Sequence, residues 1–134
     1  MSSFSDALEN KTLDHIFGGP DYVRPATLYL ALFTVAPDDA GAGGTEATGG
    51  AYARKAVTNN ATNFPASVAG AKSNGVDLDW IEATASWGTI VYVGIYDAAA
   101  AGTFLGGAAL AVSKAIAAGD IFRIKAGDLD ISLA

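Results

Sequence analysis

The sequence predicts a mainly β chain, folded as a single-domain antiparallel β-sandwich or barrel with a short N-terminal helix and a long glycine-rich loop. Short apolar segments rich in valine, isoleucine and tyrosine recur at roughly ten-residue intervals, with turn residues between them. Alanine and glycine are abundant, with 16 glycines in the chain. That composition suits thin strands and frequent turns better than a helical bundle.

The chain length of 134 residues is enough for one domain with a buried core and too short for two. Hydrophobic residues make up 51% and charged residues 16%, a balance that argues against intrinsic disorder. We divide the chain into an N-terminal helical arm, residues 1–24, and a β-sandwich domain, residues 25–134.

The arm is expected to carry a short amphipathic helix over residues 5–17. Ser3 and Asp6 have the spacing of a capping box at its start, and residues 18–20, Gly-Gly-Pro, end it. A terminal helix of this kind packs either on its own domain or on a neighbouring protein. The residues that approximate one apolar face are Phe4, Leu8, Leu13, Ile16 and Phe17.

Two segments predict the central strands. Residues 27–35 are apolar at successive positions, which indicates a strand covered on both faces. Residues 87–98 are dense in isoleucine, valine and tyrosine, with glycines that leave room for close approach or a bulge. Residues 59–75 are polar and rich in turn residues and predict a loop. Further strands are expected within 52–58, 76–83, 103–107 and 108–116, and two more within 120–133, joined at Ala126-Gly127.

The glycine-rich segment, residues 37–56, does not match a phosphate-binding loop. From Gly44 to Ala51 it reads GTEATGGA, so glycine and alanine stand where a Walker-type loop needs lysine and a hydroxyl. The segment that follows predicts a strand, whereas a dinucleotide loop opens a helix. Glycine permits close backbone approach, so we expect this loop to contact a neighbouring subunit or another partner protein.

The candidate interface residues come from the arm, from the glycine-rich loop and from the exit of that loop. Arg54 and Lys55 are the only adjacent basic pair, and we expect them to form ion pairs with an acidic neighbouring subunit. The complete set is Phe4, Leu8, Gly43, Gly44, Thr45, Glu46, Tyr52, Arg54 and Lys55.

No catalytic residue, metal ligand or cofactor site is expected. The chain has no cysteine, and His15 is its only histidine, so no Ser-His-Asp or Cys-His set can be assembled from other positions. Paired carboxylates such as Asp77 and Asp79 alternate with apolar residues, as on a solvated sheet face rather than in a glycosidase cleft.

Two alternatives remain open at this stage. Asp38, Asp39 and Glu46 offer the oxygen ligands that calcium takes, although no EF-hand spacing is present. A carbohydrate-binding module would need exposed, coplanar aromatics, with Trp80 and Trp87 in a shallow groove. Core packing is the favoured role for the aromatic residues, which include Tyr22, Tyr29, Tyr52, Trp80, Trp87, Tyr92 and Tyr96.

The negative net charge limits which partners the chain is expected to bind. Eight basic and fourteen acidic residues give a net charge of −6, which repels nucleic acid and anionic membranes. The N-terminus lacks the basic region and apolar run of a signal peptide, and no stretch of apolar residues is long enough to span a bilayer. We therefore expect neither a nucleic-acid nor a membrane partner.

Several segments of the sequence are characteristic: LENKTLDHIFGGPDY, LYLALFTVAPDD, WGTIVYVGIYDA, GGAAL and GDIFRIKAGDLDISL. They give the chain a resemblance to small virion proteins of tailed phages, a family labelled as tail-fibre or head-decoration proteins. The most distinctive segment is GGTE-x-x-GG-x-YAR, from Gly43 to Arg54. The family implies no catalytic residues.

The resemblance implies a non-enzymatic structural component of a phage particle, assembled in the host cytoplasm and carried on the virion surface. A short chain without an extended repeat favours a capsid decoration (cement) protein, with a tail-fibre or tail-tip adaptor as the alternative. The expected partners are the major capsid protein or another virion protein. Further copies of the chain are also expected as partners, most simply in a trimer.

Overall fold

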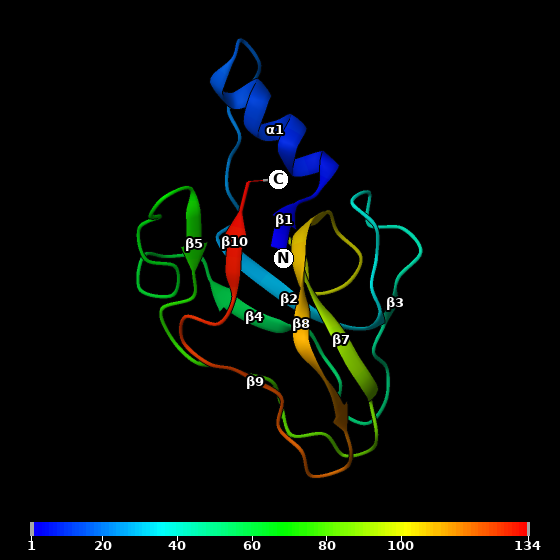
Figure 1. Ribbon diagram of the computed structural model, residues 1–134. Coiled ribbons are helices and arrows are strands. Elements are labelled where there is room, and N and C mark those ends of the chain that lie inside the picture. The colour runs from blue at the N-terminus through cyan, green and yellow to red at the C-terminus, as the bar shows by residue number, and fades with distance from the viewer. Residues whose placement is uncertain (1, 134) are drawn as a thin grey trace.

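The computed structural model describes residues 2–133, which form one helix and ten strands (Figure 1). The helix α1 spans Asp6–Ile16. The strands are β1 Ser2–Phe4, β2 Thr27–Val35, β3 Thr45–Glu46, β4 Lys55–Thr58, β5 Ala71–Ser73, β6 Leu78–Asp79, β7 Gly88–Tyr96, β8 Phe104–Ile116, β9 Arg123–Ile124 and β10 Asp130–Ser132.

The main sheet has six strands in the order β1-β8-β7-β2-β3, and β4 pairs with β2 beside β3. Every strand pair in the described residues is antiparallel, including the two small sheets β5–β10 and β6–β9. The main sheet does not close on itself, so the fold is compatible with a sandwich and is not a barrel. The predicted mainly β, antiparallel class with one short helix is confirmed.

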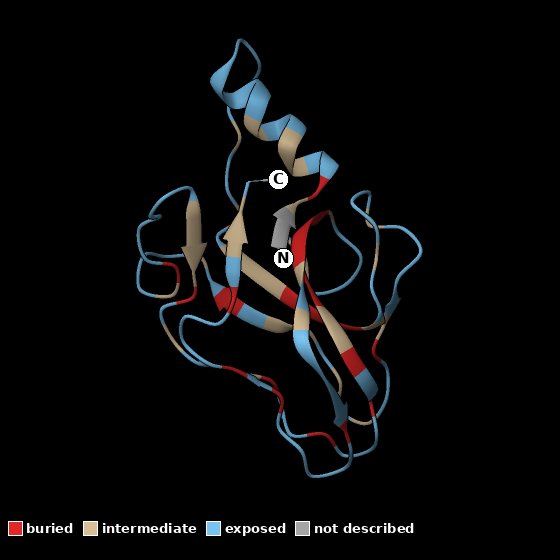
Figure 2. Ribbon diagram, viewed as in Figure 1, coloured by how far each residue is buried: buried red, intermediate tan, exposed pale blue. Residues whose placement is uncertain are grey.

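Strand register gives the main sheet two chemically different faces. Leu30 pairs with Ile95, and Leu32 pairs with Val93, so one face of β2 and β7 is aliphatic. Tyr29 pairs with Tyr96, and the ring of Phe33 lies 5.9 Å from that of Tyr92, so the opposite face is aromatic. Residues 30 to 33 are all buried, which confirms that this strand is covered on both sides (Figure 2).

The aliphatic face is covered by the segments around β6 and β9. The rings of Trp80 and Phe122 meet edge to face at 5.1 Å, and both residues are buried in the same cluster as Leu30 and Val93. Trp87 also lies in that cluster, 2% exposed. The predicted alternation over 76–83 holds, because Leu78 and Trp80 point into the core while Asp77 and Asp79 face solvent.

Several predicted element boundaries were wrong, because partners distant in sequence set them. The two strands expected at 103–107 and 108–116 are one strand, β8, which β1 and β7 pair across the glycines at 106 and 107. Strand β4 begins at Lys55 rather than at residue 52. Strand β6 is only two residues long, and β5 lies inside the predicted loop 59–75.

The N-cap of the helix lies two residues after the one that the capping box predicted. Ser5, not Ser3, is the N-cap: its Oγ accepts from the Leu8 N–H at 3.2 Å. The same Oγ donates to the Phe104 carbonyl at 2.6 Å, and the Ser5 N–H donates to Leu105 O. Ser3 belongs to β1, so the first residues of the arm are part of the main sheet. The helix itself projects from the body and buries no residue.

Glycines in β7 and β8 make room for the aromatic face. A Cβ built on Gly107 would lie 2.5 Å from the Val93 carbonyl oxygen and from the Tyr92 hydroxyl. A Cβ on Gly94 would lie 2.8 Å from the Phe33 ring. The glycines therefore let the tyrosine and phenylalanine rings lie directly over the neighbouring strands.

We predict that Gly107→Ala destabilises the fold by about 1 to 3 kcal/mol, since the added methyl meets backbone that cannot move aside. The free energy of unfolding in urea measures the effect. Ala111→Ser, at an exposed position of the same strand, is the control and should leave stability nearly unchanged. Equal stability of the Gly107→Ala variant and the wild type would contradict the close packing described here.

Candidate functional site

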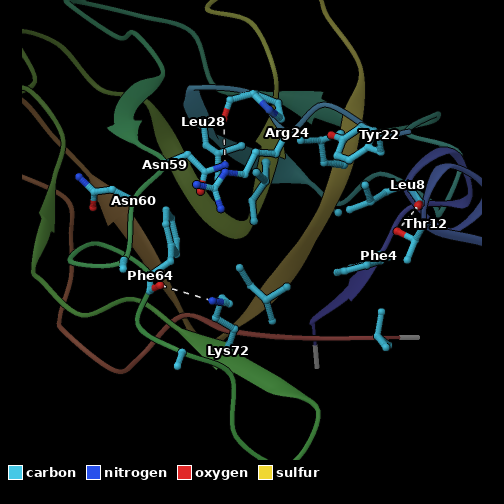
Figure 3. Close-up of a pocket in the computed structure, with 18 residues that line it drawn as sticks. Phe4, Leu8, Thr12, Tyr22, Arg24, Leu28, Asn59, Asn60, Phe64 and Lys72 are labelled. Carbon is cyan, nitrogen blue, oxygen red and sulfur yellow. Dashed lines mark hydrogen bonds between the residues drawn. The ribbon is translucent and has the colours of Figure 1, made fainter. Parts of the chain in front are cut away.

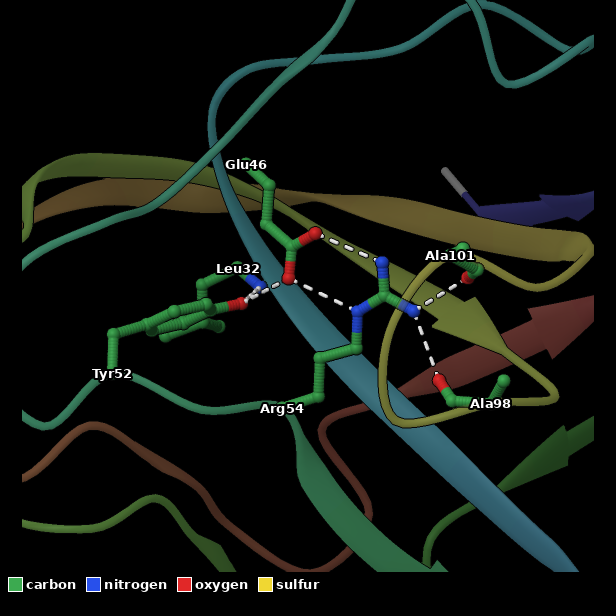
Figure 4. A network of polar contacts seen from close by, with 6 residues as sticks. All are labelled: Leu32, Glu46, Tyr52, Arg54, Ala98 and Ala101. Atoms are coloured by element: carbon green, nitrogen blue, oxygen red, sulfur yellow. Dashed lines mark hydrogen bonds and ion pairs between the residues drawn. The ribbon is translucent and has the colours of Figure 1, made fainter.

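The exit of the glycine-rich loop is held by a polar network centred on Arg54. Its members are the side chains of Glu46, Tyr52 and Arg54 and the backbone of Leu32, Ala98 and Ala101 (Figure 4). We call this set the Arg54 network. It joins three parts of the chain: strand β2, the glycine-rich loop and the turn between β7 and β8.

Arg54 makes a two-point contact with Glu46. Its Nε donates to Oε2 at 3.0 Å and its Nη2 donates to Oε1 at 2.9 Å. Its Nη1 donates to the carbonyls of Ala98 at 2.9 Å and Ala101 at 2.8 Å. The guanidinium carbon lies 4.0 Å from the centroid of the Tyr96 ring. Only 7% of the Arg54 side chain and 28% of the Glu46 side chain are exposed, so water screens the pair weakly.

Tyr52 completes the network at the point where the edge of β2 changes its pairing strand from β4 to β3. Strand β2 pairs with β4 up to Leu30 and with β3 from Phe33 onward. Between them, the Leu32 N–H donates to the Tyr52 hydroxyl at 2.9 Å, and that hydroxyl donates to Glu46 Oε2 at 2.8 Å. The Leu32 carbonyl accepts from the Ala47 N–H at 2.8 Å. Tyr52 of the network and the backbone of Ala47 thus satisfy the buried N–H and carbonyl of Leu32, which neither edge strand reaches.

The network also shifts the acidity of its members. Burial by itself raises the pKa of the Glu46 carboxyl, but hydrogen bonds from Arg54 and Tyr52, with the Arg54 charge, outweigh burial and hold the pKa below its usual value. The hydrogen bond to Glu46 raises the pKa of the Arg54 guanidinium. Burial raises the pKa of the Tyr52 phenol well above its usual range, so the hydroxyl stays protonated and donates.

The second half of the loop packs on Trp87. The Trp87 Nε1–H donates to the Gly50 carbonyl at 2.8 Å, and the Tyr52 ring meets the Trp87 ring edge to face at 5.2 Å. Gly49 has φ +134°, and a Cβ there would lie 2.5 Å from the Ser86 carbonyl oxygen, so this close contact needs glycine. The loop is therefore held down along its exit by contacts within the chain.

The first half of the loop is a tight turn with an exposed tip. Asp38 Oδ1 accepts from the N–H groups of Ala40 at 3.0 Å and Ala42 at 2.9 Å, as an Asx turn does. Gly43, Gly44 and Thr45 follow and are exposed. Those three members of the predicted interface are therefore available to a partner.

The predicted interface residues thus fall into four groups, of which the exposed Gly43, Gly44 and Thr45 are one. Glu46, Tyr52 and Arg54 come together in the Arg54 network, where Arg54 has its acidic partner within the chain rather than on a neighbouring subunit. Lys55 lies apart, beside Asp79 and Trp80 at a shallow hollow of about 410 Å³. The sequence placed Glu46 and Arg54 near each other, but nothing local indicated that they would pair.

The remaining predicted members, Phe4 and Leu8, line a larger apolar groove beneath α1, with a volume of about 580 Å³ (Figure 3). Strands β1, β2, β7, β8 and β10 all contribute to its lining, and Arg24 and Lys72 are its basic residues. Sequence reasoning did not predict this groove, because its walls come from opposite ends of the chain. Its main apolar lining residues are Phe4, Leu8, Leu28, Phe64, Ile95 and Ile131.

The structure shows where the residues of the alternative sugar-binding and metal sites lie. Trp80 and Trp87 are 3% and 2% exposed, so neither belongs to an exposed sugar-stacking platform, and their predicted core packing is confirmed. Within residues 2–133, no three His, Cys, Asp or Glu side chains gather as a metal site would require, and Asp38 instead caps its own turn. The Nδ1 of His15 accepts from the Tyr22 N–H at 3.0 Å. None of the helices described is long and apolar enough to cross a membrane.

The fold and the site define a small β protein whose distinctive features are a tied-down glycine-rich loop and an arm that projects beside an apolar groove. A family model described as podophage GP4 fiber I protein gp80 matches residues 3–132. The chain belongs to this family of phage fibre proteins, so it is a structural, virion-associated protein. Comparison with curated proteins finds no matching relative.

We predict that Arg54→Met lowers the free energy of unfolding by about 2 to 4 kcal/mol, because it removes the charge partner of the Glu46 carboxylate and the donor to two carbonyls, leaving Tyr52 as the one remaining donor to Glu46. Urea denaturation measures the loss. Arg123→Met is the matched control, since Arg123 makes a similar contact with Asp79 at 2.6 Å but on an exposed surface. Its effect should be much smaller. Similar losses in the two variants would show that shielding of the Arg54 pair contributes nothing.

The lowered pKa of Glu46 predicts a pH dependence. A carboxyl whose pKa is lower in the folded chain stabilises the fold above its ordinary value of 4.5 and loses that contribution as pH falls through the lowered value. Glu46→Gln should therefore be less stable than wild type at about pH 7, and the gap should shrink at about pH 3. Urea denaturation at both pH values measures the gap. Glu82→Gln, at an exposed position, should track the wild type throughout.

Proposed function

We propose that this chain is a non-enzymatic subunit of the fibre apparatus of a podophage-like particle, acting as a tail-fibre or tail-tip adaptor. The observation that carries the proposal is the family match over residues 3–132, whose description names a fibre. Capsid decoration, the first expectation from the sequence, is not confirmed, and the fibre alternative fits the family description better. Head decoration therefore becomes a competing outcome of the test.

The proposed docking elements are the exposed parts of the candidate interface. The loop tip presents Gly43, Gly44 and Thr45 above a base that the Arg54 network holds rigid. A preorganised loop loses little conformational entropy on binding, so a small contact can still contribute to affinity. Repetition of such contacts over several copies would strengthen the assembly by avidity.

The proposed partners are other virion proteins and further copies of the chain, arranged most simply as a trimer on the virion surface after assembly in the host cytoplasm. The net charge of −6 disfavours nucleic acid and anionic membranes as partners. A trimer would bring three loop tips together about one axis.

Cryo-electron microscopy of purified particles that carry this chain tests the location. We expect density for the fold at the tail or its fibres, in tens of copies or fewer. Hundreds of copies distributed over the head shell would establish decoration instead and contradict the fibre proposal. A particle in which the chain is absent would contradict any virion role.

The loop tip can be tested separately. We predict that replacing Ala42 and Thr45 together by lysine lowers incorporation into particles and leaves thermal unfolding nearly unchanged, because both positions flank Gly43 and Gly44, are exposed and lie outside the Arg54 network. The matched control replaces Ala99 and Ala100, exposed in the turn between β7 and β8, by lysine. If the variant is incorporated as well as the wild type, the loop only connects two strands and its proposed docking role is wrong.

A further inference from the structure

The helix α1 and the chain that follows it leave a run of large apolar side chains in solvent. Leu13 is 55% exposed, Ile16 62%, Phe17 73% and Val23 85%. Scattered apolar side chains are normal on a surface, but these belong to one short projecting arm. We call Leu13, Ile16, Phe17 and Val23 the arm stripe. A stripe of this size on a protruding element is typical of a surface that a partner covers.

An apolar groove lies directly beneath the same arm. Leu8 and Thr12 of α1 line one side of it (Figure 3), and its lining also includes Leu105 of β8 and Ile95 of β7. Phe64 lies across the groove from Leu8 (Figure 3), and Ile131 of β10 is also part of the lining. The volume of about 580 Å³ is that of a site for several large side chains rather than for one. Helices commonly bind in grooves of this kind through apolar residues on one face.

The charges around the groove favour an acidic occupant. Arg24 lies on the groove, is exposed, and takes part in none of the ion pairs or hydrogen bonds found for residues 2–133. The Lys72 Nζ donates to the Phe64 and Pro65 carbonyls and so holds a second positive charge at the rim. The helix α1 carries Asp6, Glu9 and Asp14 against a single lysine. An acidic, apolar-striped helix is therefore complementary to the groove, and the chain itself contains one.

We propose that the groove of one copy binds the arm stripe of a second copy, so that the chain assembles with itself by exchanging arms. The inference rests on the proposed role as a multicopy fibre component and names the contact between the copies. Helix α1 is about 16 Å long and projects from its domain, so it can reach the groove of a second copy that packs against the first. Each copy carries both halves of the contact, and such head-to-tail contacts close into a ring when the rotation allows.

Intermolecular disulfide formation tests the contact, because the chain has no native cysteine. Phe17→Cys places a thiol on the arm stripe, and Ala66→Cys places one at an exposed position of the groove lining. Mixing the two single variants and oxidising them should give the mixed dimer about tenfold faster than mixing Phe17→Cys with Val112→Cys. Val112 is 72% exposed on β8 and outside the groove, so it reports random collision.

Mass measurement over a concentration series up to about 1 mM gives the second readout. Wild type should self-associate, whereas Ile16→Glu with Phe17→Glu should remain monomeric and Arg24→Glu should associate more weakly. Val112→Glu, the matched surface control, should behave as wild type. Circular dichroism checks that each variant keeps its fold.

Three results would each overturn the inference. These are a wild-type monomer at every concentration, a mixed dimer no faster than the Val112→Cys control, and self-association that the arm substitutions do not alter. Finding the helix of a different virion protein in the groove would also overturn the inference. If the chain localises to the fibre but fails these assays, the arm exchange is wrong and the proposed function stands.

Discussion

The two-point pair between Arg54 and Glu46 is the interaction on which the rest of this fold most depends. It fixes the glycine-rich loop to the domain, and through Tyr52 it supports the backbone of Leu32 in the central strand. Through Ala98 and Ala101 it also holds the turn between β7 and β8. The mostly shielded guanidinium and its four acceptors hold Glu46 and Tyr52 in place, and the Tyr52 hydroxyl accepts the Leu32 N–H that a continuous neighbouring strand would otherwise pair.

The two faces of the main sheet are covered in different ways. The aliphatic face is covered by Trp80, Trp87 and Phe122 from segments with little regular secondary structure. On the aromatic face, the rings of Phe33 and Tyr92 lie close against glycines in β7 and β8. Gly41 of the loop meets Phe104 there, so the loop that carries the exposed tip also covers part of this face.

Rigidity and exposure are divided between regions in a way that suits a structural subunit. The loop tip is exposed but anchored, whereas the arm projects with its apolar stripe uncovered beside an apolar groove. Fold class and the central strands were predictable, because composition and alternation report them residue by residue. The groove was not predictable, since residues such as Phe4, Leu28 and Ile131 lie in widely separated segments that meet only in the folded chain.

By itself the sequence determined the mainly antiparallel β class, the strand at 27–35 that is covered on both faces, and the outward direction of Asp77 and Asp79. Those features follow from local side-chain order, which a strand translates directly into faces. Only the tertiary structure decided that Arg54 pairs within its own chain, that Ser5 rather than Ser3 caps the helix, and that β8 runs unbroken through its glycines. Each of these depends on a partner far along the chain: the β7–β8 turn for Arg54, the Phe104 carbonyl for Ser5, and strands β1 and β7 for β8. Spacing in the sequence does not encode which distant backbone groups will need a donor or an acceptor.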